Sequence, residues 1–416
     1  MSDHESAALG GADPNGEDAA SDTSSFYHGD EAFVVFQSAF YTDHEAFATF
    51  QFRVQALAQT LWPGTPADSI VVKKLKGGWF NRIIGISRRM TGGDVEKYIL
   101  RIPRDVHATL GRDIAALMFL HSNINIPVPQ LITYDESADN ALNMPYMIQY
   151  RIPGRNASTV FDRLSHEQRC VLAQELGDIF RRMLHVQSSR AGYFALHPDS
   201  KEPVLTPLRP MGDASQSLAP FTSGPPYLSA FDLIKSILEA EKEWQLAVVG
   251  VGLLSDLFDR FLDMLSDLGS EGWLSGVPNS LVHLDLAPRN IMIDTQSILP
   301  QSVISAILDW NSAAFAPSFL GCAPPFWIWT WDHEDEEGDE RTANDVPPTV
   351  EARELKLLFE EYAGPIYLRY AYAPQYRLLR RLTRFALNPV MLMEDIDSAE
   401  AMLREWATLR TQARED

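Results

Sequence analysis

Residues 281–310 read LVHLDLAPRNIMIDTQSILPQSVISAILDW, and this stretch decides the predicted fold. Asp285 is followed five residues later by Asn290, and an apolar strand begins directly after it. A turn leads to a second apolar strand over residues 304–308, which ends on Asp309. A hairpin of this kind turns the chain back on itself, so we expect Asp309 to approach Asn290.

The residue types in this stretch are those that phosphoryl transfer needs. A transferring phosphoryl group carries several negative charges, so its site requires a cation such as Mg²⁺, which prefers hard oxygen ligands. An acceptor hydroxyl also needs a carboxylate within hydrogen-bond reach. The order H-x-D-x-x-x-x-N, hairpin, D is closely related to the catalytic-loop pattern of protein kinases.

The chain before this stretch predicts a small α+β lobe. Apolar residues recur at helical spacing over residues 44–62. The segment SIVVKKLKGGWFNRIIGISRR reads as strand, glycine turn and strand, and VEKYILRI alternates as a third strand. A helix is predicted over residues 111–123, and the segments IPVPQLITYD and NMPYMIQYRIPG read as further strands. Sheet, helix and sheet in succession is the layout of a compact α+β lobe.

After Gly154 the chain is predicted to be mostly helical, with one short β section in the stretch quoted first. Ser165 and Gln168 form a capping-box pattern before an apolar helix, and Ser229 and Asp232 do the same before another. The segment LLSDLFDRFLDMLSDL places its leucines and phenylalanines on one face of a helix. These elements predict an α+β, bilobal fold. We expect a disordered acidic tail, a nucleotide-binding N-lobe and a C-lobe that carries the catalytic and acceptor-binding groups, over residues 1–35, 36–152 and 153–416.

Composition limits the partners. The formal net charge of the 416-residue chain is −21. Nonspecific binding to nucleic acid or to an anionic membrane depends on Lys and Arg patches, so neither is expected, whereas a cationic small molecule suits this charge. No signal peptide and no run of about 20 apolar residues is visible, so a cytoplasmic location is expected. Cys170 and Cys322 match no metal-ligand spacing, and we expect both to be buried apolar residues in a reducing compartment.

Several segments together resemble the aminoglycoside phosphotransferase and choline-kinase-like family, and its fungal members in particular. They are GGWFNRIIGI, YILRIPRD, IPVPQLITYD, MPYMIQYRIPG, VHLDLAPRNIMID and AILDWNSAAFAPSFLGCAPPFWIW. The resemblance spans residues 70–330. It implies a protein-kinase-like fold and transfer of the γ-phosphate of ATP or GTP, with Mg²⁺, to a hydroxyl of a small molecule.

The same resemblance implies roles for the residues of the quoted stretch. Asp285 would orient or deprotonate the acceptor hydroxyl. Asn290 and Asp309 would hold Mg²⁺. His283 would be structural, tying the catalytic loop to its surroundings.

In the N-lobe, the resemblance implies a nucleotide site. Gly77 and Gly78 would form the loop over the phosphates, where a missing side chain permits close backbone approach. Arg101 would meet the phosphates and Asp113 would anchor it, with Lys97 as a second cation on the same strand face. The segment Gln149, Tyr150 and Arg151 would be the hinge that holds the base through backbone groups.

The chain departs from the family pattern at a few positions. Leu284 stands where the family usually has Gly, and Arg101 stands where it has Lys, although Arg and Lys bind phosphate differently. Asp113 is shorter than the usual Glu, so we interpret Arg101 and Asp113 as a matched pair. These departures leave open a non-catalytic nucleotide-binding or scaffold protein. A protein kinase is the second alternative, but Trp310 rather than Phe-Gly follows Asp309.

Two further features could bear on the acceptor. The acidic run over residues 332–340 would suit a cationic acceptor such as an amine, but we favour a solvated loop. An aromatic group, Phe326, Trp327, Trp329 and Trp331, could line an acceptor pocket, but we favour core packing.

Overall fold

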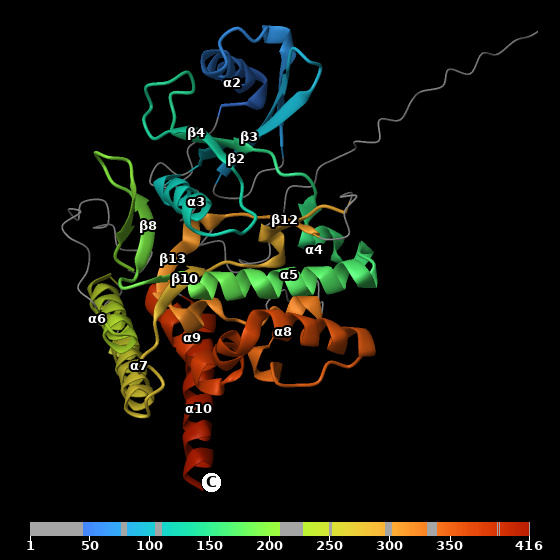
Figure 1. Ribbon diagram of the computed structural model, residues 1–416. Helices are drawn as coiled ribbons and strands as arrows, with labels where there is room; N and C mark the ends of the chain where they lie inside the picture. The colour runs from blue at the N-terminus through green and yellow to red at the C-terminus, as the bar shows by residue number, and fades with distance from the viewer. Residues whose placement is uncertain are drawn as a thin grey trace, which may run out of the picture.

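The chain forms two lobes in the computed structural model, a β-rich N-lobe above a larger and mainly helical C-lobe (Figure 1). The predicted α+β, bilobal fold is confirmed. Within the described residues, no helix has the length and apolar character to cross a membrane. The predicted tail lies outside those residues, and the predicted lobe boundary near residue 152 stays a prediction. The structure describes residues 45–75, 81–104, 110–208, 228–248, 252–295, 302–330, 339–388, 390 and 392–415.

The N-lobe is built on an antiparallel five-stranded sheet with the strand order β1-β2-β3-β5-β4. Helix α2 lies beside this sheet at the far end of the molecule, and α3 lies on the side that faces the C-lobe (Figure 1). The predicted helices and strands of this lobe are confirmed. Their bounds are α2 Phe47–Leu61, β1 Ile70–Lys74, β2 Asn81–Arg89, β3 Val95–Pro103, α3 Leu110–Asn123, β4 Leu131–Asp135 and β5 Tyr146–Tyr150.

Each lobe has its own hydrophobic core. In α2 the buried residues Phe50, Val54 and Leu57 recur at helical spacing and pack with buried residues of the sheet. Helix α3 belongs to the other core, because Ile114 and Leu117 pack with the C-lobe residues. The helix between the lobes is therefore fixed mainly by the C-lobe, although it follows the third strand of the N-lobe sheet.

The C-lobe is organised around α5, which lies along α8, with α6 and α7 forming a hairpin at one side (Figure 1). The predicted capping box of α5 is confirmed. Ser165 Oγ accepts from the Gln168 N–H (3.2 Å), and Gln168 Oε1 accepts from the Ser165 N–H (2.9 Å). The helices are α4 Ala157–Val160, α5 His166–His185, α6 Ala230–Val248, α7 Gly252–Ser270, α8 Val350–Tyr372, α9 Pro374–Leu387 and α10 Met393–Glu415.

The prediction of a single β section in the C-lobe was wrong. A second five-stranded sheet has the order β7-β10-β13-β8-β9. Strand β8 is buried on both faces and contacts α3, so it lacks the polar and apolar alternation that marks a half-buried strand. The strands of this sheet are β7 Gln187–Ser188, β8 Gly192–Leu196, β9 Pro203–Thr206, β10 Asn279–His283 and β13 Ala313–Pro317.

The predicted hairpin is confirmed as β11 (Ile291–Ile293) and β12 (Ile304–Ile307), with the short β6 (Arg155–Asn156) paired to β11. One carboxylate fixes it to the C-lobe: Glu175 Oε2 on α5 accepts from the backbone N–H groups of Val303 and Ile304, both at 2.9 Å. Because β12 runs directly toward Asp309, this contact sets where that aspartate lies.

We expect Glu175→Ala to lower the free energy of unfolding by about 2–3 kcal/mol, because two buried N–H donors lose a charged acceptor. Urea unfolding of the purified variant measures this loss. Glu175→Gln retains an acceptor oxygen and should lose less. A loss of only about 0.5 kcal/mol in Glu175→Ala, the size of a surface substitution, would contradict this role.

Candidate active site

The loop after β10 holds Asp285 by its neighbours in sequence. Asn290 Nδ2 donates to the backbone oxygen of Asp285 (2.8 Å) and to its Oδ2 (3.0 Å). Arg289 pairs with the other carboxylate oxygen. Asn290 uses its amide nitrogen for both bonds, and its Oδ1 takes no part in them. The Asp285 side chain is 40% exposed, so a bound molecule can reach it.

His283 ties this loop to the hairpin. Its Nδ1 accepts from the Asp285 N–H (3.2 Å), so the ring proton sits on Nε2, which donates to the Leu308 oxygen (2.9 Å). The ring also packs edge-on against Trp310, with the ring centroids 4.7 Å apart. Burial lowers the pKa of His283, so the ring is neutral. These contacts fit the predicted structural role.

Asp309 lies beside Asn290, as the hairpin predicted. The Leu308 N–H donates to the Asn290 backbone oxygen (2.7 Å), which brings the end of β12 against the loop that carries Asp285. Asp309 has a left-handed backbone, with φ 62° and ψ 57°, at the start of the short 3-10 helix Trp310–Ser312. This turn directs the chain from β12 into β13 and leaves the Asp309 side chain 32% exposed.

Arg101 joins the two lobes at this point. Its Nη1 lies 2.7 Å from Asp113 Oδ2, and its Nη2 donates to Asp309 Oδ1 at 3.2 Å. The planar guanidinium fork meets two carboxylates from separate elements, which a single ammonium group cannot do with the same geometry. Arg101 and Asp113 are therefore paired, as predicted, while Lys97 on the same strand is exposed.

Burial and charge have opposite effects on the pKa values of Arg101 and Asp113. Burial raises the pKa of Asp113 to about 6, and the positive charge of Arg101 offsets only part of that rise. Burial alone would lower the pKa of Arg101, but Asp113 and Asp309 outweigh it and hold the pKa above its usual value. The guanidinium therefore keeps its charge in a nearly dry environment.

Burial also raises the pKa of Asp285, and the positive charge of Arg289 offsets part of the rise. A carboxylate with a raised pKa accepts a proton more readily than an ordinary aspartate does. Arg289 lies four residues after Asp285 in the sequence, and that spacing was the signal by which sequence reasoning could have found it.

The predicted hinge is the end of β5 and the residue after it. The Tyr150 N–H donates to the Gln130 oxygen (3.0 Å) and the Arg151 N–H to the Lys97 oxygen (2.9 Å). These two donors are thus engaged within the protein, so a base would have to use other backbone groups of the segment. Gln149 is 6% exposed, and its Oε1 has no hydrogen-bond partner among the described residues.

Of the remaining predicted residues, some lie within the described part of the chain and others do not. Gly77 and Gly78 lie outside the described residues, as do Trp331 and residues 332–338 of the acidic run. The other three aromatic residues are at most 6% exposed, which agrees with core packing: Phe326, Trp327 and Trp329. At the end of the acidic run, Glu340 pairs with Arg380 of α9.

Sequence reasoning also missed Asn156, a neighbour of the site. Asn156 Nδ2 donates to the Arg289 backbone oxygen, which fixes the loop from the β6 side. Leu284, the departure from the family's Gly, packs against the C-lobe core. Its side chain is therefore partly buried against the C-lobe core.

Residues 72–319 match the family model described as the phosphotransferase enzyme family. A subtelomeric hrmA-associated cluster protein of Aspergillus fumigatus is 21% identical over 361 residues, covering 71% of this chain and 68% of that protein. Altered inheritance of mitochondria protein 9, mitochondrial, of Yarrowia lipolytica is 19% identical over 387 residues, covering 79% of this chain and 66% of the other.

Two solved structures are similar at low identity. The GDP complex of aminoglycoside 2'-phosphotransferase-IIIa is 13% identical, with a TM-score of 0.47, over 86% of this chain and 99% of that one. A ternary complex of aminoglycoside phosphotransferase APH(4)-Ia with AMP-PNP and hygromycin B is 18% identical, with a TM-score of 0.47, over 85% and 96% of the two chains.

The raised pKa of Asp113 predicts a distinctive pH dependence of stability. Folded Asp113, with a pKa of about 6 against the ordinary 3.8, binds its proton more tightly than the unfolded chain does. Its contribution therefore favours folding below about pH 4 and is lost as pH rises through 6, by about 3 kcal/mol in total. Urea unfolding of the wild type and Asp113→Asn should show their difference changing by this amount between those pH values.

Asp135→Asn is the matched control for this measurement. Although burial would raise the pKa of Asp135, hydrogen bonds from Ser137 lower it, so its difference from the wild type should change in the opposite direction. A constant difference between the wild type and Asp113→Asn across the range would show that Asp113 has an ordinary pKa.

Proposed function

Because the chain belongs to the phosphotransferase enzyme family, we propose that it transfers the γ-phosphoryl group of ATP or GTP to a hydroxyl of a small molecule, with Mg²⁺. The observation that carries the proposal is the meeting of Asp285, Asn290 and Asp309, with Arg101 reaching Asp309 from the N-lobe. Two of these side chains keep more than a quarter of their surface exposed, as a site that binds ligands requires.

Asp285 is the proposed base. Its carboxylate is held from two sides by Arg289 and Asn290, so it cannot rotate away from an acceptor hydroxyl. Its raised pKa makes it a stronger proton acceptor than an ordinary aspartate. The reaction then depends on positioning and charge neutralisation more than on covalent chemistry.

The donor set near Asp309 fits Mg²⁺. Asn290 Oδ1 and the Asp309 carboxylate are hard oxygens, and neither sulfur nor imidazole takes part in the pair. Mg²⁺ held there would neutralise charge on the nucleotide phosphates. Arg101 donates to Asp309 through Nη2 in this structure, and its Nη1 pairs with Asp113. If Asp309 held a metal, the N–H of Arg101 that now bonds it would be available for a phosphate oxygen.

The acceptor is proposed as a small molecule that carries a hydroxyl. The net charge of −21 suits a cationic one. The similar solved structures include a GDP and kanamycin complex of an aminoglycoside phosphotransferase as well as the hygromycin B complex. Glu340 is a weak candidate for recognising such a cation, because its carboxylate is already paired with Arg380.

The environment of Trp310 bears on the protein-kinase alternative. Trp310 is fully buried, and its indole N–H donates to the Ile307 oxygen at 2.9 Å. Together with its contact to His283, this fixes the residue that follows Asp309. A segment anchored in this way is unsuited to the order-to-disorder change of a regulated activation loop. The proposal therefore favours a constitutively formed site for a small acceptor.

We expect Asp285→Asn to lower nucleotide turnover by about 100- to 10,000-fold, because the base is replaced by an amide of equal size. Turnover is measured as ADP release with kanamycin, hygromycin B or water as acceptor. Nucleotide binding should change little, since the proposed phosphate contacts are elsewhere. Unchanged turnover in a folded variant would remove Asp285 from catalysis.

Calorimetric titration of ATP and of GTP, with and without Mg²⁺, tests the proposal before any acceptor is known. We expect binding to be strengthened by Mg²⁺ in the wild type, and this strengthening to be lost in Asp309→Ala, which lacks a metal ligand. Asp294→Ala, on the same hairpin, is the control. Absent or metal-independent binding would favour a non-catalytic member of the family.

A further inference from the structure

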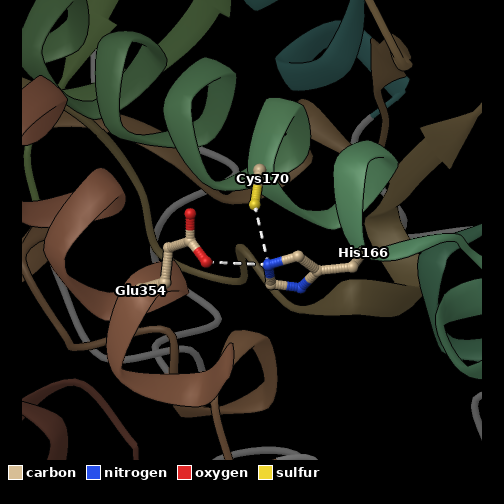
Figure 2. Close-up of side chains that lie close together, drawn as sticks. All are labelled: His166, Cys170 and Glu354. Carbon is tan, nitrogen blue, oxygen red and sulfur yellow. Dashed lines mark hydrogen bonds and ion pairs between the residues drawn. The ribbon is translucent and has the colours of Figure 1, made fainter. Parts of the chain in front are cut away.

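Three side chains of the kinds that bind transition metals meet where α5 lies against α8. His166 and Cys170 project from the first turns of α5, and Glu354 projects from α8 toward them (Figure 2). None of the three belongs to the candidate active site described above. Their ligand atoms all lie within 4.8 Å of one another.

The spacing on α5 explains why two of them share one direction. His166 and Cys170 are four residues apart, so they lie on the same helix face. The His166 ring points its Nε2 at both partners, 3.5 Å from Cys170 Sγ and 2.9 Å from Glu354 Oε2 (Figure 2). Sequence reasoning had matched neither cysteine to a metal-ligand pattern, because the third group comes from a distant helix.

These separations suit tetrahedral zinc. Zinc bonds of about 2.1 Å to nitrogen and about 2.3 Å to sulfur place the two ligand atoms about 3.5 Å apart in a tetrahedral site. The His166–Cys170 separation already has this value. Glu354 has to move only by the shift that its long side chain allows, since 55% of that side chain is exposed. Its exposure also provides the entry path for an ion.

Two carboxylates, those of Glu354 and Glu167, lie near the thiol of Cys170. Burial raises the pKa of Cys170, and the negative charges of Glu354 and Glu167 raise it further. The thiol is therefore poorly suited to act as a free nucleophile, which argues against a cysteine-based catalytic site. A divalent ion between the groups would reverse this balance and favour the thiolate.

No hydrogen bond at Nδ1 fixes the tautomer of His166. Nδ1 is buried and has no hydrogen-bond partner within the described part of the chain. The proton can therefore reside on Nδ1 and leave the Nε2 lone pair for a metal. The lack of a partner at Nδ1 also means weaker binding than at sites where a second group orients the histidine.

We propose that His166, Cys170 and Glu354 form a Zn²⁺ site that links α5 to α8. Nitrogen, sulfur and carboxylate ligands select zinc over Mg²⁺ and Ca²⁺, which prefer oxygen. Three protein ligands leave the fourth position to water. Since α5 also carries Glu175, which holds β12, an ion at this contact stabilises the scaffold on which Asp309 depends.

Zinc titration into the full chain, kept reduced and free of nucleotide, tests the site. We expect one Zn²⁺ to bind and to raise the melting temperature, because it binds only the folded arrangement. His166→Ala and Cys170→Ser should each weaken binding by about 100-fold, at least as much as loss of an outer partner costs at known sites. His185→Ala on α5 and Glu351→Gln on α8 are matched controls and should bind as the wild type does.

Cobalt provides a readout that identifies the sulfur ligand. Co²⁺ bound by the wild type should show a thiolate charge-transfer band, absent in Cys170→Ser and retained in His185→Ala. The proposal is overturned if the wild type binds no Zn²⁺, or if the ligand variants keep its affinity and its rise in melting temperature. The cluster would then be a His–Glu ion pair beside a thiol.

Discussion

The guanidinium of Arg101 lies between Asp113 of α3 and Asp309 at the end of β12, and the candidate site depends on this contact. The strand that carries Arg101 belongs to the N-lobe sheet, whereas α3 packs in the C-lobe core. One side chain therefore bridges the two lobes at the candidate site. A rigid planar fork performs this task with two separate N–H groups, which explains how Arg can replace the usual Lys when a shorter Asp replaces Glu.

The opposite side of the site is fixed through backbone contacts. Glu175 holds β12 through two N–H groups, and His283 links the loop of Asp285 to Leu308. Asn290 completes the arrangement by bonding both the backbone and the carboxylate of Asp285. The polar groups are thus positioned by neighbours that are themselves buried or half-buried, so little reorganisation would be needed on binding of a charged ligand.

The sequence predicted the α+β fold, the hairpin and the approach of Asp309 to Asn290, because these follow from local periodicity and spacing. It could not predict β8, since a strand buried on both faces resembles any short apolar segment. It also could not predict the role of Glu175, because its partners lie more than a hundred residues away and are backbone N–H groups, which every residue except proline has. The sequence likewise could not predict that the Tyr150 and Arg151 N–H groups are hydrogen-bonded within the protein, because tertiary packing decides the strand register.

The left-handed backbone of Asp309 restricts what the chain can place there. With φ at 62°, most side chains would suffer a clash that costs about 1–2 kcal/mol, whereas Gly, Asn and Asp tolerate this conformation. Of these three, only Asp also supplies a negative charge. The turn and the proposed chemistry thus favour the same residue independently. We expect substitutions at this position in related chains to be mainly Asn or Gly. A chain with either residue would keep its fold but lose the carboxylate.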